Sequence, residues 1–270
     1  MLQATIIRTS RTSVLSRFFR RFLSTPAQKD AFLEPITKYP GVVSLALNRP
    51  KAKNAISVNL LKELTECLEE AHYDKSIRVL ILKSTTVGSF CAGADLAERR
   101  NMTQHQVNKF LTDLRGALGK LEALPMPTIA AIDGPALGGG LELSLACDLR
   151  VAGHEVTKIG LPETALGIIP GAGGTQRATR HLNGARLVNY VSDAGASAFD
   201  RALVLAEVIA KNAPLALRAA KQAVSRAEDL TLETGLDFER TSYETLLPTK
   251  DRLEALNAFR EKRKPVFRGE

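Results

Sequence analysis

The feature that most constrains the fold is a repeated alternation between short apolar runs and longer segments with helical periodicity. Four runs have the length and composition of buried strands: residues 42–47, 79–82, 127–132 and 149–152. Between them, Ser57 is placed to cap a helix that continues through Tyr73, and Thr103 is placed to cap a longer one. Strands that alternate with helices predict an α/β domain with crossover helices packed on a sheet.

The pattern becomes almost wholly helical after Gly171. Pro214 stands at the first turn of one predicted helix, where its missing N–H costs nothing. Thr249 or Asp251 opens another predicted helix. We therefore expect an α/β body followed by a helical tail.

The basic character of the chain is concentrated at its two ends. The 270 residues carry a formal net charge of +8, but residues 1–28 hold five arginines and no acidic residue, and residues 260–268 carry +4. The rest of the chain carries −1. A nucleic-acid-binding domain concentrates Lys and Arg on its folded surface, so this distribution does not favour that class.

The first 23 residues are predicted to be a mitochondrial presequence. They are rich in Arg, Ser and Thr, and apolar side chains recur at helical spacing away from the arginines: Leu15, Phe18, Phe19 and Phe22. The arginines exclude the unbroken apolar centre of a secretory signal, while a basic surface helix remains the alternative. We expect processing near Leu23, a core over residues 24–190 and a helical region over residues 191–270.

The sequence does not support a membrane protein, a disulfide-rich protein or a metal-binding protein. No apolar run approaches the roughly 18 residues that a membrane span requires. Three cysteines (Cys67, Cys91 and Cys147) are too few and too scattered for a disulfide framework, and the four histidines show no ligand spacing. We therefore expect reduced thiols, no metal and no membrane span.

Three glycine-rich loops follow predicted strands: residues 90–95, 133–142 and 170–177. None matches a phosphate-binding or dinucleotide-binding fingerprint. The second loop opens a helix from about Gly139, where free N–H groups and the helix dipole suit an oxyanion. One N–H from this loop and one from Ala94 would polarise a thioester carbonyl. The alternative is that the three consecutive glycines form only a tight packing corner.

Two carboxylates accompany these loops. Glu142 directly follows the glycines in an otherwise apolar helix, and Glu163 lies in a Gly-Leu-Pro-Glu segment. Burial raises the pKa of a carboxyl group, which suits acid–base chemistry near neutral pH. A structural ion pair with Arg or Lys is the alternative interpretation of each.

Taken together and in this order, the motifs resemble the enoyl-CoA hydratase/isomerase (crotonase) superfamily from about Ala31 to Glu270. They are Asn48-Arg49-Pro50 with Asn54-Ala55, Phe90 to Leu96, Gly138 to Leu143 with Cys147-Asp148, and Pro162-Glu163 with Gly167 to Arg177. The resemblance implies a spiral of ββα turns followed by a helical trimerisation region, assembled as a trimer or a dimer of trimers.

The resemblance also implies roles for individual residues. The Ala94 and Gly139 amides would form the oxyanion hole, and Glu142 and Glu163 would hold a water that adds to C3 of a 2-enoyl-CoA. The presence of both glutamates favours a hydratase over an isomerase. A hydratase belongs to the lyases. CoA arrives with the substrate, so no separate cofactor is implied. The implied CoA contacts are Lys53, Ala92, Asp95 and Leu96, with Phe259 and Lys262 closing over the adenine and phosphates. A solvated charged end is the alternative for the last two.

Within the family, residues 249–263 and the final Arg-Gly-Glu are most similar to mitochondrial methylglutaconyl-CoA hydratases of leucine breakdown. This implies 3-methylglutaconyl-CoA or a short-chain enoyl-CoA of fatty-acid oxidation as substrate, in the mitochondrial matrix. Some relatives bind RNA through a lysine-lined helix, but the segment 57–73 carries a net charge of −3 here, which disfavours RNA binding. The sequence does not predict which residue contacts the far end of the acyl chain.

The chain departs from the family pattern near residues 180–188. It runs from Arg180 almost directly into Leu187-Val188-Asn189, so it lacks one helix and its turn, roughly 20 residues. The missing piece would pack beside the Glu163 loop. This leaves a second function open, in which a shortened and catalytically weak or inactive family member binds acyl-CoA or acts as an assembly subunit.

Overall fold

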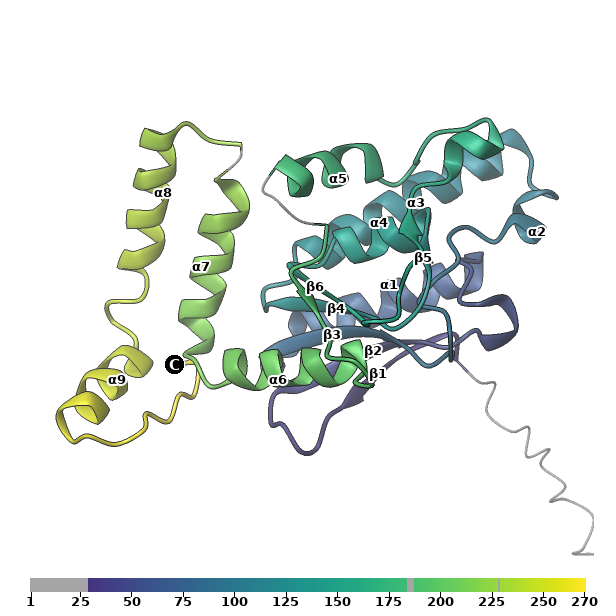
Figure 1. Ribbon diagram of the computed structural model, residues 1–270. Helices are drawn as coiled ribbons and strands as arrows, with labels where there is room; N and C mark the ends of the chain where they lie inside the picture. The colour runs from purple at the N-terminus through teal and green to yellow at the C-terminus, as the bar shows by residue number, and fades with distance from the viewer. Residues whose placement is uncertain (1–28, 184–186, 228) are drawn as a thin grey trace, which may run out of the picture.

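The computed structural model describes residues 29–183, 187–227 and 229–270 (Figure 1). Its centre is a six-stranded sheet in the order β1-β2-β3-β4-β6-β8, in which β1 is antiparallel to β2 and the other pairs are parallel. The strands are β1 (Ala31–Pro35), β2 (Val42–Leu47), β3 (Val79–Ser84), β4 (Thr128–Ile132), β6 (Leu149–Ala152) and β8 (Tyr190–Val191). The predicted presequence lies outside the described residues.

Helices cover both faces of this sheet, as Figure 1 shows. On one face, α1 (Val58–Tyr73) and α3 (Gln104–Glu122) pack against the sheet through the larger apolar core. The other face is covered by α6 (Ala198–Ala210), which presents four alanines at a spacing of four residues: Ala198, Ala202, Ala206 and Ala210. The alanine side chains of α6 are small, so this helix can lie close to the strands. The helices α1 and α3 instead bury faces that are rich in the larger leucine.

The predicted helix starts are confirmed. The Ser57 hydroxyl accepts a hydrogen bond from the Leu60 N–H at 3.0 Å. Thr103 forms a capping box with Gln106, in which each side chain accepts from the other residue's N–H. Thr249, rather than Asp251, caps α9. These caps satisfy N–H groups that have no acceptor inside their own helix.

A second, smaller layer turns the fold into a spiral. Short β5 (Ala136–Leu137) pairs with β7 (Ile159–Gly160), and isolated bridges join Ile56 to Ala94 and Cys91 to Ala136. Each turn therefore passes from a central strand through this layer into a helix. The turns end in α1, α3, α4 (Gly139–Leu145) and α5 (Gly174–Asn183), and short helices η1 (Pro50–Ala52), α2 (Leu96–Arg99) and η2 (Glu163–Leu166) lie in the connections. The expected spiral of ββα turns is confirmed.

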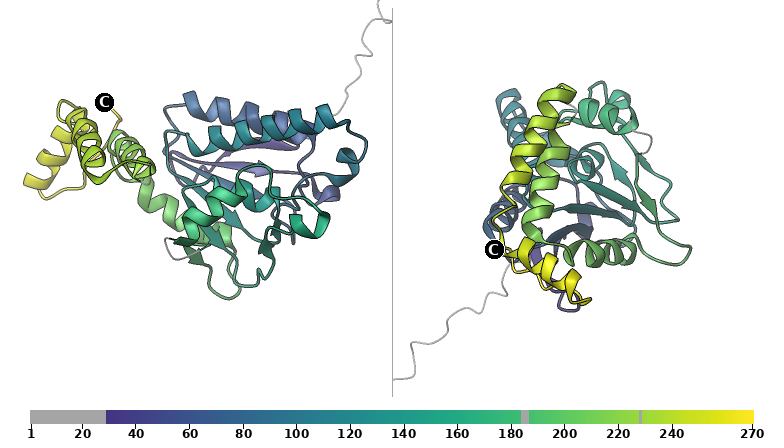
Figure 2. Two further views of the ribbon diagram at one scale, coloured as in Figure 1. Left: turned by 90° about the horizontal axis from the view of Figure 1, so that it is seen from above. Right: turned by 90° about the vertical axis from the view of Figure 1, so that its left-hand side faces the viewer.

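The C-terminal helices lie beside the body, as the left view in Figure 2 shows. They are α7 (Pro214–Arg226), α8 (Leu232–Glu244) and α9 (Lys250–Arg260), with Pro214 at the first turn of α7 as predicted. On α7, Lys221 forms a salt bridge of 2.7 Å with Asp148 of the body. The short β8 is the exception to the predicted helical character after Gly171. Among the described residues, none of the helices is long and apolar enough to cross a membrane.

Arg150 contacts both sides of the region in which the sequence predicts a shortened chain. Its side chain is 2% exposed and donates to the carbonyls of Leu187 (2.9 Å) and Cys147 (2.8 Å). Its backbone N–H donates to the Asn189 side chain at 2.8 Å. A buried guanidinium thus joins the end of α4 to the segment that leads into β8.

We expect Arg150→Leu to lower the free energy of unfolding by about 3 kcal/mol, because the leucine cannot donate the hydrogen bonds that the Cys147 and Leu187 carbonyls now accept. The corresponding fall in Tm is roughly 6–12 °C for a domain of this size. Thermal denaturation followed by circular dichroism measures it, with the exposed Arg260→Leu as the control. Equal melting temperatures for the two variants would show that Arg150 does not fasten this segment.

Candidate active site

A cavity of about 190 Å³ forms where the three glycine-rich loops meet. Six of the residues predicted from the sequence line it: Ala92, Ala94, Leu96, Gly139, Glu142 and Glu163. Most of the other lining residues are apolar and come from α3 and the segment 166–171. The volume is below the 300–1,000 Å³ that is usual for a whole small-molecule site, so the cavity suits the acyl end of a larger ligand.

Glycines allow the first two loops to come into direct contact. Gly93 has φ +89°, and a Cβ there would lie 2.7 Å from the Leu137 carbonyl oxygen. A Cβ at Gly140 would collide with the Cys91 carbonyl. Any side chain at either position would force the loops apart. The glycines therefore do form a tight corner, and the same corner positions the backbone amides.

Ala94 and Gly139 present neighbouring backbone amides to the cavity. A Cβ built on Gly139 would lie 3.7 Å from the Ala94 nitrogen. Gly139 is the first residue of α4, where an N–H has no acceptor within the helix. Within the described ranges, neither N–H donates to a backbone carbonyl. Two free donors at a helix N-terminus are the components of an oxyanion hole.

Glu142 is buried in α4, with 2% of its surface exposed. Its Oε1 accepts hydrogen bonds from the backbone N–H groups of Ala172 (2.8 Å) and Gly174 (2.7 Å). In the part of the chain that the structure describes, Glu142 forms no ion pair with Arg or Lys. The third glycine-rich loop therefore holds the carboxylate in place through Oε1, and the alternative of a structural ion pair is not what the structure shows.

Glu163 is the first residue of η2 and is 8% exposed. Its Oε2 is buried, and among the described residues no group forms a hydrogen bond with it. Burial raises the pKa of Glu163, and the negative charge of Glu142 raises this pKa further. The carboxyl group thus keeps its proton to higher pH than an exposed glutamate, and its Oε2 is available to a ligand or water.

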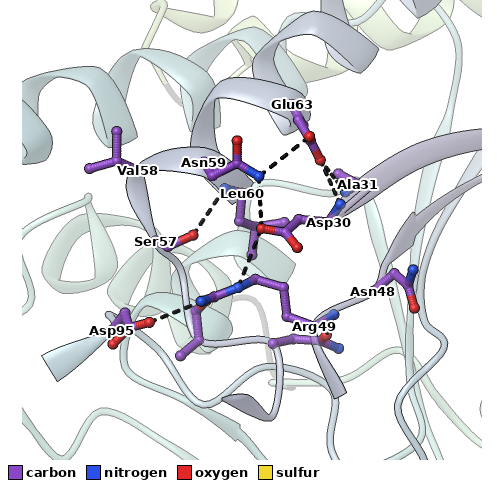
Figure 3. A network of polar contacts seen from close by, with 12 residues as sticks. Asp30, Ala31, Asn48, Arg49, Ser57, Val58, Asn59, Leu60, Glu63 and Asp95 are labelled. Carbon is purple, nitrogen blue, oxygen red and sulfur yellow. Dashed lines mark hydrogen bonds and ion pairs between the residues drawn. The ribbon is translucent and has the colours of Figure 1, made fainter. Parts of the chain in front are cut away.

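The predicted CoA contacts in the first half of the chain gather beside the cavity. The Lys53 carbonyl accepts from the Ala92 N–H at 3.1 Å, and Lys53, Ala92 and Leu96 are all exposed. Asp95 has a structural role, because it caps α2 and accepts a 3.1 Å hydrogen bond from Arg49, which also pairs with Asp30 (Figure 3). Contact of these residues with CoA remains a prediction.

Phe259 and Lys262 are not brought to this cavity within one chain. Phe259, on α9, is 86% exposed, and Lys262 follows that helix. Figures 1 and 2 place α9 at the opposite side of the molecule from α2. Their predicted closure over CoA would therefore have to act on the site of another copy.

Sequence reasoning missed Arg99, which also lines the cavity. Its guanidinium carbon lies 5.2 Å from the centre of the Phe110 ring, and its Nε and Nη2 are buried without a hydrogen-bond partner among the described residues. Burial lowers the pKa of this guanidinium, and the charge of Glu142 opposes that shift. The available signal was its position, four residues after Asp95 and directly behind the first glycine-rich loop.

Comparison with known proteins gives a consistent result. The family model "Enoyl-CoA hydratase/isomerase" matches residues 37–198 and 187–270. "Enoyl-CoA isomerase/hydratase fer4" of Mycosarcoma maydis is 48% identical over 88% of this chain and 97% of its own. Human "Methylglutaconyl-CoA hydratase, mitochondrial" is 44% identical over 85% and 74%. The crystal structure of an enoyl-CoA hydratase from Bacillus anthracis superimposes with a TM-score of 0.84 and 42% identity, over 90% of this chain and all of the other.

The same alignments agree with a shortened chain. The alignment with the fer4 protein spans 269 positions, although 88% of 270 residues is only about 238, so about 31 positions have no counterpart here. For the human methylglutaconyl-CoA hydratase, 253 positions against about 230 residues leave about 23. The two family-model matches overlap at residues 187–198, next to the predicted shortening. Motifs, fold, cavity and comparisons agree that this chain belongs to the enoyl-CoA hydratase/isomerase family of enzymes.

Proposed function

We propose that the protein adds water across the double bond of a 2-enoyl-CoA thioester and yields the 3-hydroxyacyl-CoA. The observation that carries the proposal is that two buried carboxylates, Glu142 and Glu163, line the same small cavity as the paired amides of Ala94 and Gly139. Such a cavity supplies both the acid–base groups and the oxyanion donors that hydration requires.

In the proposed reaction, the thioester oxygen accepts hydrogen bonds from the Ala94 and Gly139 N–H groups. Glu142 removes a proton from the bound water as its oxygen bonds to C3, and the electron pair of the double bond moves toward C2 and the carbonyl. Glu163, whose raised pKa lets it retain a proton, protonates C2. The proton held by Glu142 then restores Glu163, so the net change is one water added.

The substrate we propose has a short acyl chain, either 3-methylglutaconyl-CoA of leucine degradation or a short-chain enoyl-CoA of fatty-acid oxidation. The small cavity and the similarity to a mitochondrial methylglutaconyl-CoA hydratase support this. That similarity and the arginine-rich start also support the mitochondrial matrix as location. A homotrimer or dimer of trimers is supported by exposed apolar side chains on the C-terminal helices, among them Leu236, Tyr243 and Leu253.

Hydration of crotonyl-CoA and 3-methylglutaconyl-CoA by residues 24–270 tests the proposal. The loss of absorbance of the conjugated thioester follows the reaction, and Glu142→Gln is the control. Turnover that disappears in the control supports a hydratase with two catalytic glutamates, and the faster substrate identifies the pathway. A folded protein without turnover on either substrate would contradict the proposal.

One observation favours the second function, that of a weakly active or inactive subunit that binds acyl-CoA or assembles with intact relatives. The wall of the cavity beside Glu163 is uncovered: Leu166, Ile168 and Ile169 are 56%, 46% and 70% exposed. Apolar side chains in this position are normally covered by another element. The missing helix is the element that would cover them.

Restoring that helix is therefore expected to raise kcat/KM at least about tenfold, because a covered site holds its catalytic groups in place and excludes water. The insert is the corresponding segment of the human methylglutaconyl-CoA hydratase, about 23 residues, placed between Asn183 and Leu187. A Gly/Ser insert of equal length is the control. Equal activity of the original chain and the restored chain would show that the shortened form is already complete for catalysis.

A further inference from the structure

The starting point is Arg99, a cationic residue that lines the cavity. Two nitrogen atoms of Arg99, Nε and Nη2, are buried and have no hydrogen-bond partner in the described part of the chain. An arginine remains charged at physiological pH, and a buried charge without a partner is costly. A protein that keeps such a group in a ligand cavity gains from it when an anion is bound.

The acidic groups nearby are already engaged elsewhere. Glu98 accepts from the Val58 N–H at 2.9 Å, and Asp95 accepts from Arg49 and from the Glu98 N–H. Glu142 uses its Oε1 for two backbone amides. Among the described residues, Arg99 takes part in no ion pair. Phe110 packs on the guanidinium, so the ring supports the group without using its in-plane N–H donors.

The position of Arg99 within the cavity indicates which anion would be suitable. The Ala94 and Gly139 amides mark the place of the thioester oxygen, and the two glutamates mark the reacting carbons. Arg99 lines the same cavity, together with apolar side chains from α3 and the 166–169 segment: Val107, Leu111, Leu114, Leu166, Ile168 and Ile169. The phosphates of CoA cannot be the intended partner, because they lie at the opposite end of the ligand from the acyl group. A second anion on the short acyl group can reach this cation.

We propose that the Arg99 guanidinium binds a carboxylate at the far end of the acyl group, so that the substrate class is a 2-enoyl-CoA with a second, free carboxylate. This inference rests on the proposed function and makes it more specific. Guanidinium and carboxylate match in geometry and form charge-assisted hydrogen bonds. The same pairing offsets the repulsion between a substrate carboxylate and the ionised Glu142.

The test compares a substrate that carries the second carboxylate, 3-methylglutaconyl-CoA, with one that lacks it, crotonyl-CoA. Arg99→Gln is expected to lower kcat/KM for 3-methylglutaconyl-CoA by about 10- to 100-fold and for crotonyl-CoA by less than about threefold. Arg99→Lys, which keeps the charge, should recover part of the loss. The exposed neighbour provides the matched control, Arg100→Gln, which should change neither substrate. Equal losses for both substrates, or no loss for either, would overturn the inference.

A binding measurement separates this inference from the proposed function. Calorimetry with the saturated, unreactive pair glutaryl-CoA and butyryl-CoA requires no turnover. Tighter binding of glutaryl-CoA by about tenfold or more, lost in Arg99→Gln, would support the carboxylate site even if the wild-type protein hydrated nothing. Equal affinity for the two ligands would overturn the site even if hydration were observed.

Discussion

Glu142→Gln is expected to lower kcat for hydration by about 10²- to 10⁴-fold, the usual contribution of a general acid–base group. The amide oxygen of glutamine can still accept the hydrogen bonds that Oε1 now receives from Ala172 and Gly174. The fold and the third loop should therefore be unchanged, while the group that removes a proton from water is lost. Steady-state turnover and a thermal melt together measure both properties.

The matched control for this variant is Glu66→Gln, which makes the same chemical change at an exposed position on α1. It should retain full turnover. If Glu142→Gln kept more than about a tenth of the wild-type kcat, Glu142 would not be the catalytic base. If it instead lowered Tm as well as kcat, its loss of activity would be structural.

Glu163→Gln is expected to abolish turnover to a similar extent and to stabilise the protein at neutral pH. Burial raises the pKa of Glu163 in the folded state, so ionisation opposes folding at pH values above the unfolded-state pKa. At a pH below the unfolded-state pKa of about 4.5, ionisation of Glu163 does not reduce the stability of the wild type. At a pH above the raised pKa, the reduction in stability is complete. Neutral glutamine removes this reduction, so the variant should melt at a higher temperature than the wild type at pH 7–8.

The difference in Tm between Glu163→Gln and wild type should therefore be smallest at pH 4, grow as pH rises toward the raised pKa of Glu163, and stay constant above that pKa. Thermal melts from pH 4 to 8 measure it, with Glu66→Gln providing the baseline for an exposed carboxyl group. A difference that is constant with pH, or a variant that melts below wild type at pH 7, would show that ionised Glu163 is not a burden to the fold.

Local signals in the sequence were sufficient for most of the helices and central strands. The apolar runs at β2, β3, β4 and β6 and the caps at Ser57 and Thr103 each act over a few residues, so their physics is visible in the chain itself. Strands β1, β5, β7 and β8 were not identified. Three of these are two residues long and exist because distant segments pair with them, which no local pattern records.

The site was predicted in large part through the family resemblance. The structure brings Ala94, Gly139, Glu142 and Glu163 to one cavity, but it places Phe259 and Lys262 at the other side of the molecule. A role for these two residues at the site of another copy in an assembly stays a prediction. The sequence also offered two possible caps for α9, and only hydrogen-bond geometry selected Thr249 over Asp251.

The sequence by itself determined the α/β body and the helical tail, because periodicity and capping are properties of neighbouring residues. The order of its motifs also indicated a shortening near residues 180–188 and, through the family resemblance, two candidate catalytic carboxylates. Only the tertiary structure decided that the third loop donates two amides to Glu142 and that Arg99 lines the cavity. It also showed that, among the described residues, one oxygen of Glu163 and two nitrogens of Arg99 are buried without a hydrogen-bond partner. Burial and hydrogen-bond satisfaction depend on what surrounds a group in space, and these surroundings come from segments far apart in the chain.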